Sequence, residues 1–123
     1  MPIALDPKQT FPLWLDSDAD KSPRAEFHFR ALTIADRKRV YELPERFKAN
    51  ESITENEIIS QSVELFVDLC GGWSNMVGRD GQPVVFSADA VEAVLTHQEL
   101  WELMYKSAEN SHVSNEEKKR SES

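Results

Sequence analysis

Cysteine is almost absent from this sequence of 123 residues, which contains only Cys70. A single cysteine cannot form an intramolecular disulfide, so the chain does not fit the class of small secreted domains that depend on disulfides. The N-terminal residues also lack a basic stretch followed by a long apolar run. No apolar stretch approaches the ~20 residues needed to cross a bilayer. These absences predict a soluble, cytoplasmic protein with no membrane partner.

Glycine is also scarce, and acidic residues outnumber basic ones, 22 to 14. The chain has four glycines, and Gly71-Gly72 follows a predicted helix, whereas a dinucleotide-binding loop follows a strand. The net charge is −8, and residues 51–72 contain acids but no base. Such a chain repels nucleic acid phosphates, and the short basic run 37–39 is too small to reverse that. We therefore expect a protein partner and no nucleic acid.

The aromatic and aliphatic content is ordinary for a folded domain. A chain of this length forms one domain and can bury a core without metal or disulfides. We expect that domain to span residues 10–109, after an N-terminal extension of residues 1–9. Residues 110–123 have almost nothing to bury and are predicted to form a disordered polar tail.

Two segments near the N-terminus show the alternation of a half-buried strand. Apolar residues occupy every second position in residues 10–16 and again in residues 26–32. The segment between them is polar and rich in turn-forming residues, which predicts a β-hairpin. Pro12 cannot donate a ladder hydrogen bond, so the first strand should lie at an edge of its sheet.

The periodicity becomes helical after residue 32. Thr33 and Asp36 predict a capping box at the start of a first helix, which Pro44 is expected to end or kink. A second, central helix begins after Thr54 and has a broad apolar face. We expect it to stop at Gly71-Gly72, since glycine accepts the left-handed conformation common at helix ends.

Two further helices complete the expected fold. Ser87 predicts the start of a short helix over residues 88–95, and Thr96 with Glu99 predicts another capping box before the last helix. Asp80-Gly81 predicts a tight turn. The sequence thus predicts an α+β fold, mainly helical, in which an N-terminal β-hairpin packs on about four helices.

The sequence offers little for catalysis. The acidic run of residues 16–20 resembles the opening of a calcium-binding loop, but Lys21 and Phe27 stand where such a loop needs glycine and glutamate. No histidine has metal-ligand spacing. Cys70 lies on the apolar face of the central helix, where a thiol acts as a small hydrophobe. We therefore expect no catalytic residue, no metal, no cofactor and no enzymatic activity.

The exposed face of the central helix is the candidate partner-binding surface. Glu57, Gln61, Glu64 and Asp68 follow one another at helical spacing as an acidic ridge with no cation within the helix. A solvated face that keeps the protein soluble is the stronger alternative for this ridge. Trp73, directly after the helix, is a candidate binding anchor, although packing of its indole over the helix end is the stronger alternative.

Three stretches carry a family resemblance over residues 11–106. They are "FHFRALTIADRKRVYEL", "LFVDLCGGWSN" and "DGQPVVFSADAVEAVLTHQELWELM". The order of a "FRALT" strand-to-helix step, a helix ending near Gly-Trp, a "G-x-P-x-x-F-S" turn and an "L-T-x-x-E-L-x-E-L" helix resembles the small tail assembly chaperones of long-tailed bacteriophages and prophages. These motifs are short and structural, not chemical.

The resemblance implies a non-enzymatic role in tail morphogenesis. Such a chaperone holds the long helical tape measure protein until tail tube subunits polymerise around it. The tail tube protein and a second copy of the chain stay open as further partners. Two alternatives are a structural tail-completion or connector protein of a phage particle, and an acidic regulator directed at a host protein.

Overall fold

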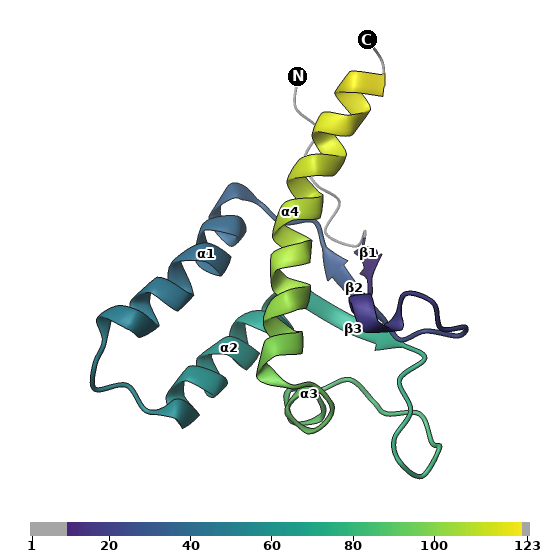
Figure 1. The fold of residues 1–123 in the computed structure, drawn as a ribbon, viewed down its shortest axis with the longest axis horizontal. Helices are drawn as coiled ribbons and strands as arrows, with labels where there is room; N and C mark the ends of the chain where they lie inside the picture. The colour runs from purple at the N-terminus through teal and green to yellow at the C-terminus, as the bar shows by residue number, and fades with distance from the viewer. Residues whose placement is uncertain (1–9, 122–123) are drawn as a thin grey trace.

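The computed structural model describes the backbone of residues 10–121 and the side chains of residues 10–109. The predicted α+β class is confirmed over these residues. The predicted extension, residues 1–9, lies outside them. The elements follow in this order (Figure 1): β1 (Thr10–Leu13), a short 3-10 helix (Asp16–Asp18), β2 (Glu26–Arg30), α1 (Ile34–Ala49), α2 (Glu55–Leu69), β3 (Cys70–Ser74), α3 (Ala88–Val94) and α4 (His97–Ser121).

The three strands form one antiparallel sheet in the order β1-β2-β3. Leu13 pairs with Phe27 and Phe11 with Phe29, so apolar side chains share one face of the β1–β2 pair. β1 lies at an edge, as Pro12 predicts. The pairing that was expected as a two-stranded hairpin is therefore part of a larger sheet, with β2 in its centre.

The expectation that the central helix stops at Gly71-Gly72 in a left-handed conformation is wrong. The central helix ends at Leu69, and the chain continues directly into β3, with Cys70 in an extended conformation at φ −107°. Among the described residues only Asn75 and Gly81 have positive φ. Phe29 pairs with Cys70 and His28 with Gly72, so Gly71 is an extra residue on β3. Gly71 thus forms a β-bulge.

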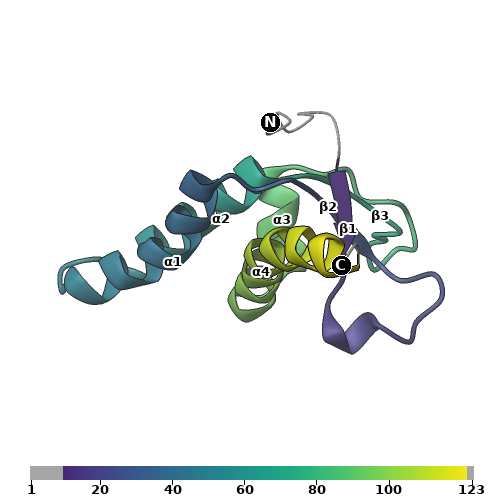
Figure 2. The ribbon, with the colours of Figure 1, turned by 90° about the horizontal axis from the view of Figure 1, so that it is seen from above.

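The core forms where α2 and α4 meet the apolar face of the sheet. The ring of Phe66 on α2 lies edge-on to Phe29 at 5.5 Å and to Phe27 at 6.3 Å, measured between ring centroids. All three rings are fully buried. Each contributes about 2 kcal/mol through burial of apolar surface. Figure 2 shows α1 and α2 beside one another, and α4 contacts both helices and β1, joining the helical pair to the sheet.

Pro44 does not end the first helix, because α1 continues through it to Ala49. A proline inside a helix costs about 3 kcal/mol. Tertiary packing offsets this cost, since Val40 before the proline is buried and Leu43 and Phe47 pack against the same core. A helix whose apolar stripe is anchored on both sides of a proline does not end at it.

The last helix, α4, runs through Ser121 and so continues into the segment that the sequence predicts as a disordered tail. Residues 110–121 contain neither glycine nor proline, and several of them are good helix formers. No helix in the described part of the chain is both long and apolar enough to cross a membrane.

Candidate functional site

Helices α1 and α2 form a pair joined by the loop of residues 50–54. Each helix begins with a capping box, as Thr33 and Asp36 predict for the first. The backbone N–H of Asp36 donates to Thr33 Oγ1 at 3.1 Å, and the N–H of Glu57 donates to Thr54 Oγ1 at 3.2 Å. In both cases the acidic side chain also accepts from the threonine N–H. These caps fix where the two helices start, and hence which residues face one another across the pair.

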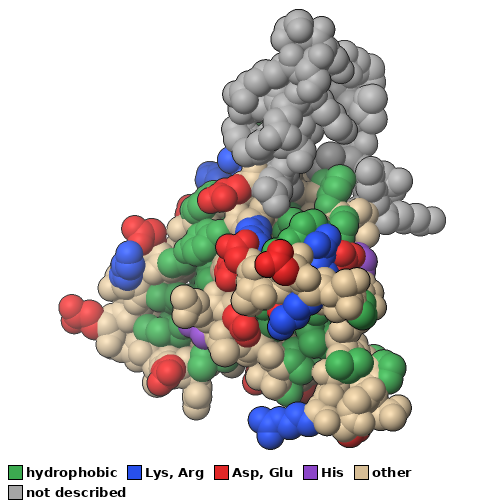
Figure 3. All heavy atoms as spheres, turned by 45° about the vertical axis from the view of Figure 1, so that its right-hand side comes forward, with side chains coloured by type: hydrophobic (Ala, Val, Ile, Leu, Met, Phe, Trp, Pro, Cys, Tyr) green, Lys and Arg blue, Asp and Glu red, His purple; other side chains and the backbone are tan. Residues whose placement is uncertain are grey.

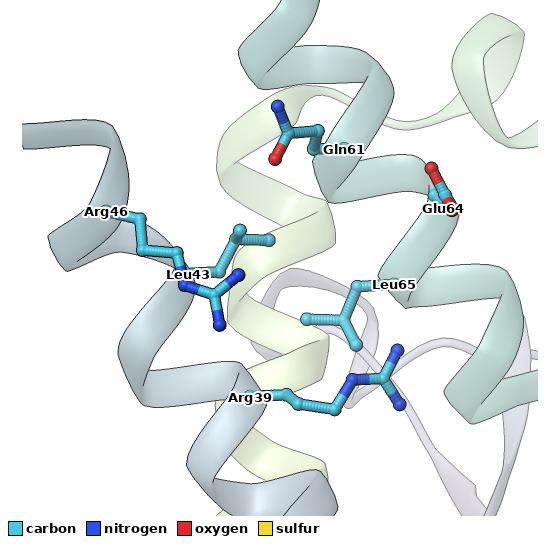
Figure 4. Close-up of a pocket in the computed structure, with 6 residues that line it drawn as sticks. All are labelled: Arg39, Leu43, Arg46, Gln61, Glu64 and Leu65. Carbon is cyan, nitrogen blue, oxygen red and sulfur yellow. The ribbon is translucent and has the colours of Figure 1, made fainter. Parts of the chain in front are cut away.

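A hollow with a volume of about 410 Å³ lies between the two helices; we call it the α1–α2 groove. It is lined from α1 by Arg39, Leu43 and Arg46, and from α2 by Gln61, Glu64 and Leu65. Figure 4 shows Leu43 and Leu65 directed toward one another across the gap, with α4 passing behind the pair. The groove therefore has an aliphatic centre and is open on one side.

Polar side chains border this aliphatic centre on both helices. Arg46 and Glu64 are exposed, and neither side chain makes a hydrogen bond or an ion pair with any described residue. The same holds for the amide of Gln61. The groove thus offers one unpaired cation on α1 and one unpaired anion on α2. On the face of the molecule that Figure 3 draws, acidic and basic side chains are interspersed.

One end of the groove is closed by a cluster of two arginines and two aspartates. Arg30 from β2 contacts Asp36 at 2.5 Å and Asp68 at 3.3 Å. Arg39 contacts Asp68 at 2.6 Å and Asp36 at 3.5 Å. Arg30 Nε also donates to the backbone oxygen of Asp68, which is a carbonyl in the last turn of α2. The cluster ties β2, α1 and α2 together.

Asp36 is the buried member of this cluster, with a residue exposure of 6%. Burial alone would raise the pKa of its carboxyl group. Hydrogen bonds from Arg30 and Thr33, with the positive charge of Arg30, outweigh that effect and lower the pKa to about 2. Asp36 is therefore ionised at neutral pH, and both arginines have a permanent counter-charge.

The structure separates the four residues of the predicted ridge into three environments. All four are exposed. Gln61 and Glu64 border the α1–α2 groove, Glu57 is engaged in the cap of α2, and Asp68 is held by the arginines of β2 and α1. The ridge is thus acidic along its own helix, but cations from other elements neutralise its C-terminal end.

Trp73 lies on β3, away from the groove residues. Its indole N–H donates to the backbone oxygen of Val84 at 2.7 Å, and its ring lies edge-on to Phe86 and Phe27. The side chain therefore fixes the loop that follows β3 against the sheet. The loop itself has the predicted turn, with Gly81 at φ 79°. These contacts are those of a packing residue, which was the alternative given for Trp73.

Cys70 is fully buried, as predicted. Burial raises the pKa of its thiol to about 11, more than the hydrogen bonds from the backbone lower it. The thiol is therefore protonated at neutral pH, and a protonated thiol is a poor nucleophile.

The acidic run near the N-terminus is engaged by lysines. Asp16 contacts Lys106 at 2.7 Å, and Asp18 contacts Lys21 at 2.8 Å. Within the residues that the structure describes, no group of three histidine, cysteine, aspartate or glutamate side chains is arranged to hold a metal ion. The imidazole of His97 instead lies 3.0 Å from the indole nitrogen of Trp101, which donates to it.

Sequence reasoning missed the arginines of the groove. Arg39 and Arg46 stand seven residues apart on α1 with Leu43 between them, so all three share one helix face. This spacing is the sequence signal that could have placed both arginines on one surface. In the sequence Arg39 belongs to the short basic run 37–39, and the position of α1 beside α2 depends on contacts distant in sequence.

Comparisons of the chain with protein-family models, with curated proteins and with solved structures give no match.

Proposed function

We propose that this protein is a non-enzymatic binding protein that holds a helical segment of another protein in the α1–α2 groove. The observation that carries the proposal is the aliphatic centre formed by Leu43 and Leu65 between the unpaired Arg46 and Glu64. Amphipathic helices bind other proteins by placing apolar side chains in such grooves, with polar contacts at the rim. The groove lies on the surface of a helical pair, where a third helix can pack at the usual interaxial distance of about 8–10 Å.

The resemblance to tail assembly chaperones gives this partner an identity. We propose that the bound helix belongs to the tape measure protein of a long phage tail and that the protein keeps it from aggregating until the tail tube forms. The tail tube protein and a second copy of the chain are the further candidate partners. A groove with one apolar centre suits this role, because a small contact surface dissociates fast enough to release the helix when the tail tube forms.

The test is capture of partners from the source cells while they produce phage particles. Tagged wild-type protein is compared with Glu64→Lys, which reverses the unpaired charge of α2, and with Glu92→Lys as a matched control. Glu92 is an exposed and unpaired acid on α3, outside the groove. Retained proteins are quantified by mass spectrometry, and finished particles are assayed for the chain.

We expect wild type and Glu92→Lys to retain one very long helical protein, Glu64→Lys to retain several times less of it, and finished particles to lack the chain. Presence of the chain in finished particles would instead support a tail-completion or connector protein. Recovery of a host enzyme or nucleic-acid-binding protein would support the acidic regulator. Either result would contradict the chaperone proposal.

A further inference from the structure

The two walls of the α1–α2 groove carry opposite unpaired charges, and this asymmetry restricts which helices fit. Arg46 on α1 has no ion-pair partner among the described residues, whereas the neighbouring Arg39 is held by Asp68 at 2.6 Å. Glu64 on α2 is free, and Gln61 beside it is neutral. A helix lying in the groove therefore meets one cation along one side and one anion along the other.

From this charge complementarity we infer that the occupant is a helix with an aliphatic stripe, acidic residues along one flank and basic residues along the other. The aliphatic stripe contacts chiefly the half-buried Leu43, because Leu65, at the base of the groove, is 4% exposed. The acidic flank faces Arg46 and the basic flank faces Glu64. A helix with two acidic flanks would place an unmatched acid at Glu64, and one with two basic flanks would place a base at Arg46, both of which are repulsive.

This inference rests on the proposed function, since it specifies the partner helix of the same groove. It is independent of the identity of the partner protein, because the recognition is set by charge and by apolar contact. Helix direction is left free: reversing an asymmetric helix exchanges its flanks, so one orientation always matches the groove.

The test uses three synthetic helical peptides of about 21 residues, or six turns. Each has leucines along one stripe. The mixed peptide has one acidic and one basic flank, the both-acidic peptide has two acidic flanks, and the both-basic peptide has two basic flanks. Compensating charges on the outward face give all three peptides the same net charge. The overall charge of −8 on the protein then contributes equally to the three affinities. Binding to the full chain is measured by fluorescence anisotropy at low and at physiological salt.

Wild type should bind the mixed peptide about tenfold more tightly than either uniform peptide, with the difference smaller at higher salt. Glu64→Lys should bind the both-acidic peptide best, and Arg46→Glu the both-basic peptide best. Lys38→Glu, which changes an exposed, unpaired base of α1 outside the groove lining, should keep the wild-type order. If either reversed variant proves unfolded, Glu64→Gln and Arg46→Gln replace them. Glu64→Gln should abolish the discrimination against the both-acidic peptide and keep that against the both-basic peptide, and Arg46→Gln should do the converse.

Three results would overturn the inference. In the first, wild type binds the three peptides equally; in the second, it binds none of them; in the third, both reversed variants keep the wild-type order of affinities. The outcome is distinguishable from failure of the proposed function. If the capture experiment retains a long helical protein through Glu64 but the peptides are not discriminated, the binding function holds and the charge rule fails. If the peptides are discriminated but no helical protein is captured, the charge rule holds and the proposed function fails.

Discussion

Nη1 of Arg39 lies 2.6 Å from Oδ2 of Asp68, so a residue predicted for the partner-binding ridge instead holds α1 against the end of α2. Arg30 contacts the same carboxylate from β2. The exposed acids of α2 therefore have different roles. Asp68 organises the helical pair, whereas Glu64, one turn earlier, is free to meet a partner.

The first prediction separates these two roles. Asp68→Lys should lower the free energy of unfolding by about 1–2 kcal/mol, because it removes one of the two carboxylates that Arg30 and Arg39 share and adds a third cation beside them. Glu64→Lys should change it by less than about 0.5 kcal/mol, since that side chain has no partner to lose. Urea unfolding followed by tryptophan fluorescence measures both. Equal losses in the two variants would contradict the assignment of roles.

The second prediction concerns acid stability. The pKa of Asp36 is about 2 in the folded protein against 3.8 for the free group, so its carboxylate stabilises the fold above pH 3.8 and loses that effect as the pH falls through 2. This group should account for about 2 kcal/mol of lost stability between about pH 5 and pH 2. Urea titrations across this range should show a shallower pH dependence for Asp36→Asn. Parallel curves for the two proteins would place the acid-sensitive carboxylates elsewhere.

Local signals in the sequence were sufficient for the helix starts and insufficient for the groove. A capping box involves four consecutive residues, so Thr33 with Asp36 and Thr96 with Glu99 are readable before any tertiary structure is known. β3 escaped prediction because two of its five residues are glycines, which are depleted in strands. Its strand conformation comes from pairing with β2, some 45 residues earlier in the sequence.

The difference between local and long-range signals also explains which residues of the α1–α2 groove could be predicted. Gln61 and Glu64 could be selected as exposed positions of one amphipathic helix. Arg46 could not be assigned to the same surface, because only the packing of α1 beside α2 brings it there. The neutralisation of Asp68 likewise depends on Arg30, a strand residue that lies 38 positions away in sequence.

The third prediction tests the packing role of Trp73. Trp73→Phe keeps an aromatic ring but removes the indole N–H that donates to Val84. The loss of this hydrogen bond should cost about 1 kcal/mol and release the loop that contains Arg79. Limited trypsin digestion should then cleave after Arg79 faster than in wild type, whereas Trp14→Phe should leave that rate unchanged. An unaltered rate in Trp73→Phe would show that other contacts fix the loop.

The fourth prediction concerns the single thiol. Cys70 is fully buried and the pKa of its thiol is raised to about 11, so both access and ionisation oppose its reaction. A water-soluble disulfide reagent should modify the folded protein only as fast as the protein opens, and should modify it rapidly in denaturing urea. Absorbance of the released thiolate reports both rates. Rapid reaction in the folded state would mean that the thiol is accessible and that its buried position at the α2–β3 junction is wrong.

The most direct measurement of partner binding at the α1–α2 groove is site-specific photo-crosslinking in cells that produce the particle. A photoreactive amino acid is placed at Gln61, which borders the groove without a hydrogen-bond partner, or at Glu92 on α3 as the control. We expect the probe at position 61 to become joined to a helical segment of one long protein and the probe at position 92 to remain unjoined to it. Crosslinking of that protein from position 92 but not from position 61 would contradict the groove as the binding site.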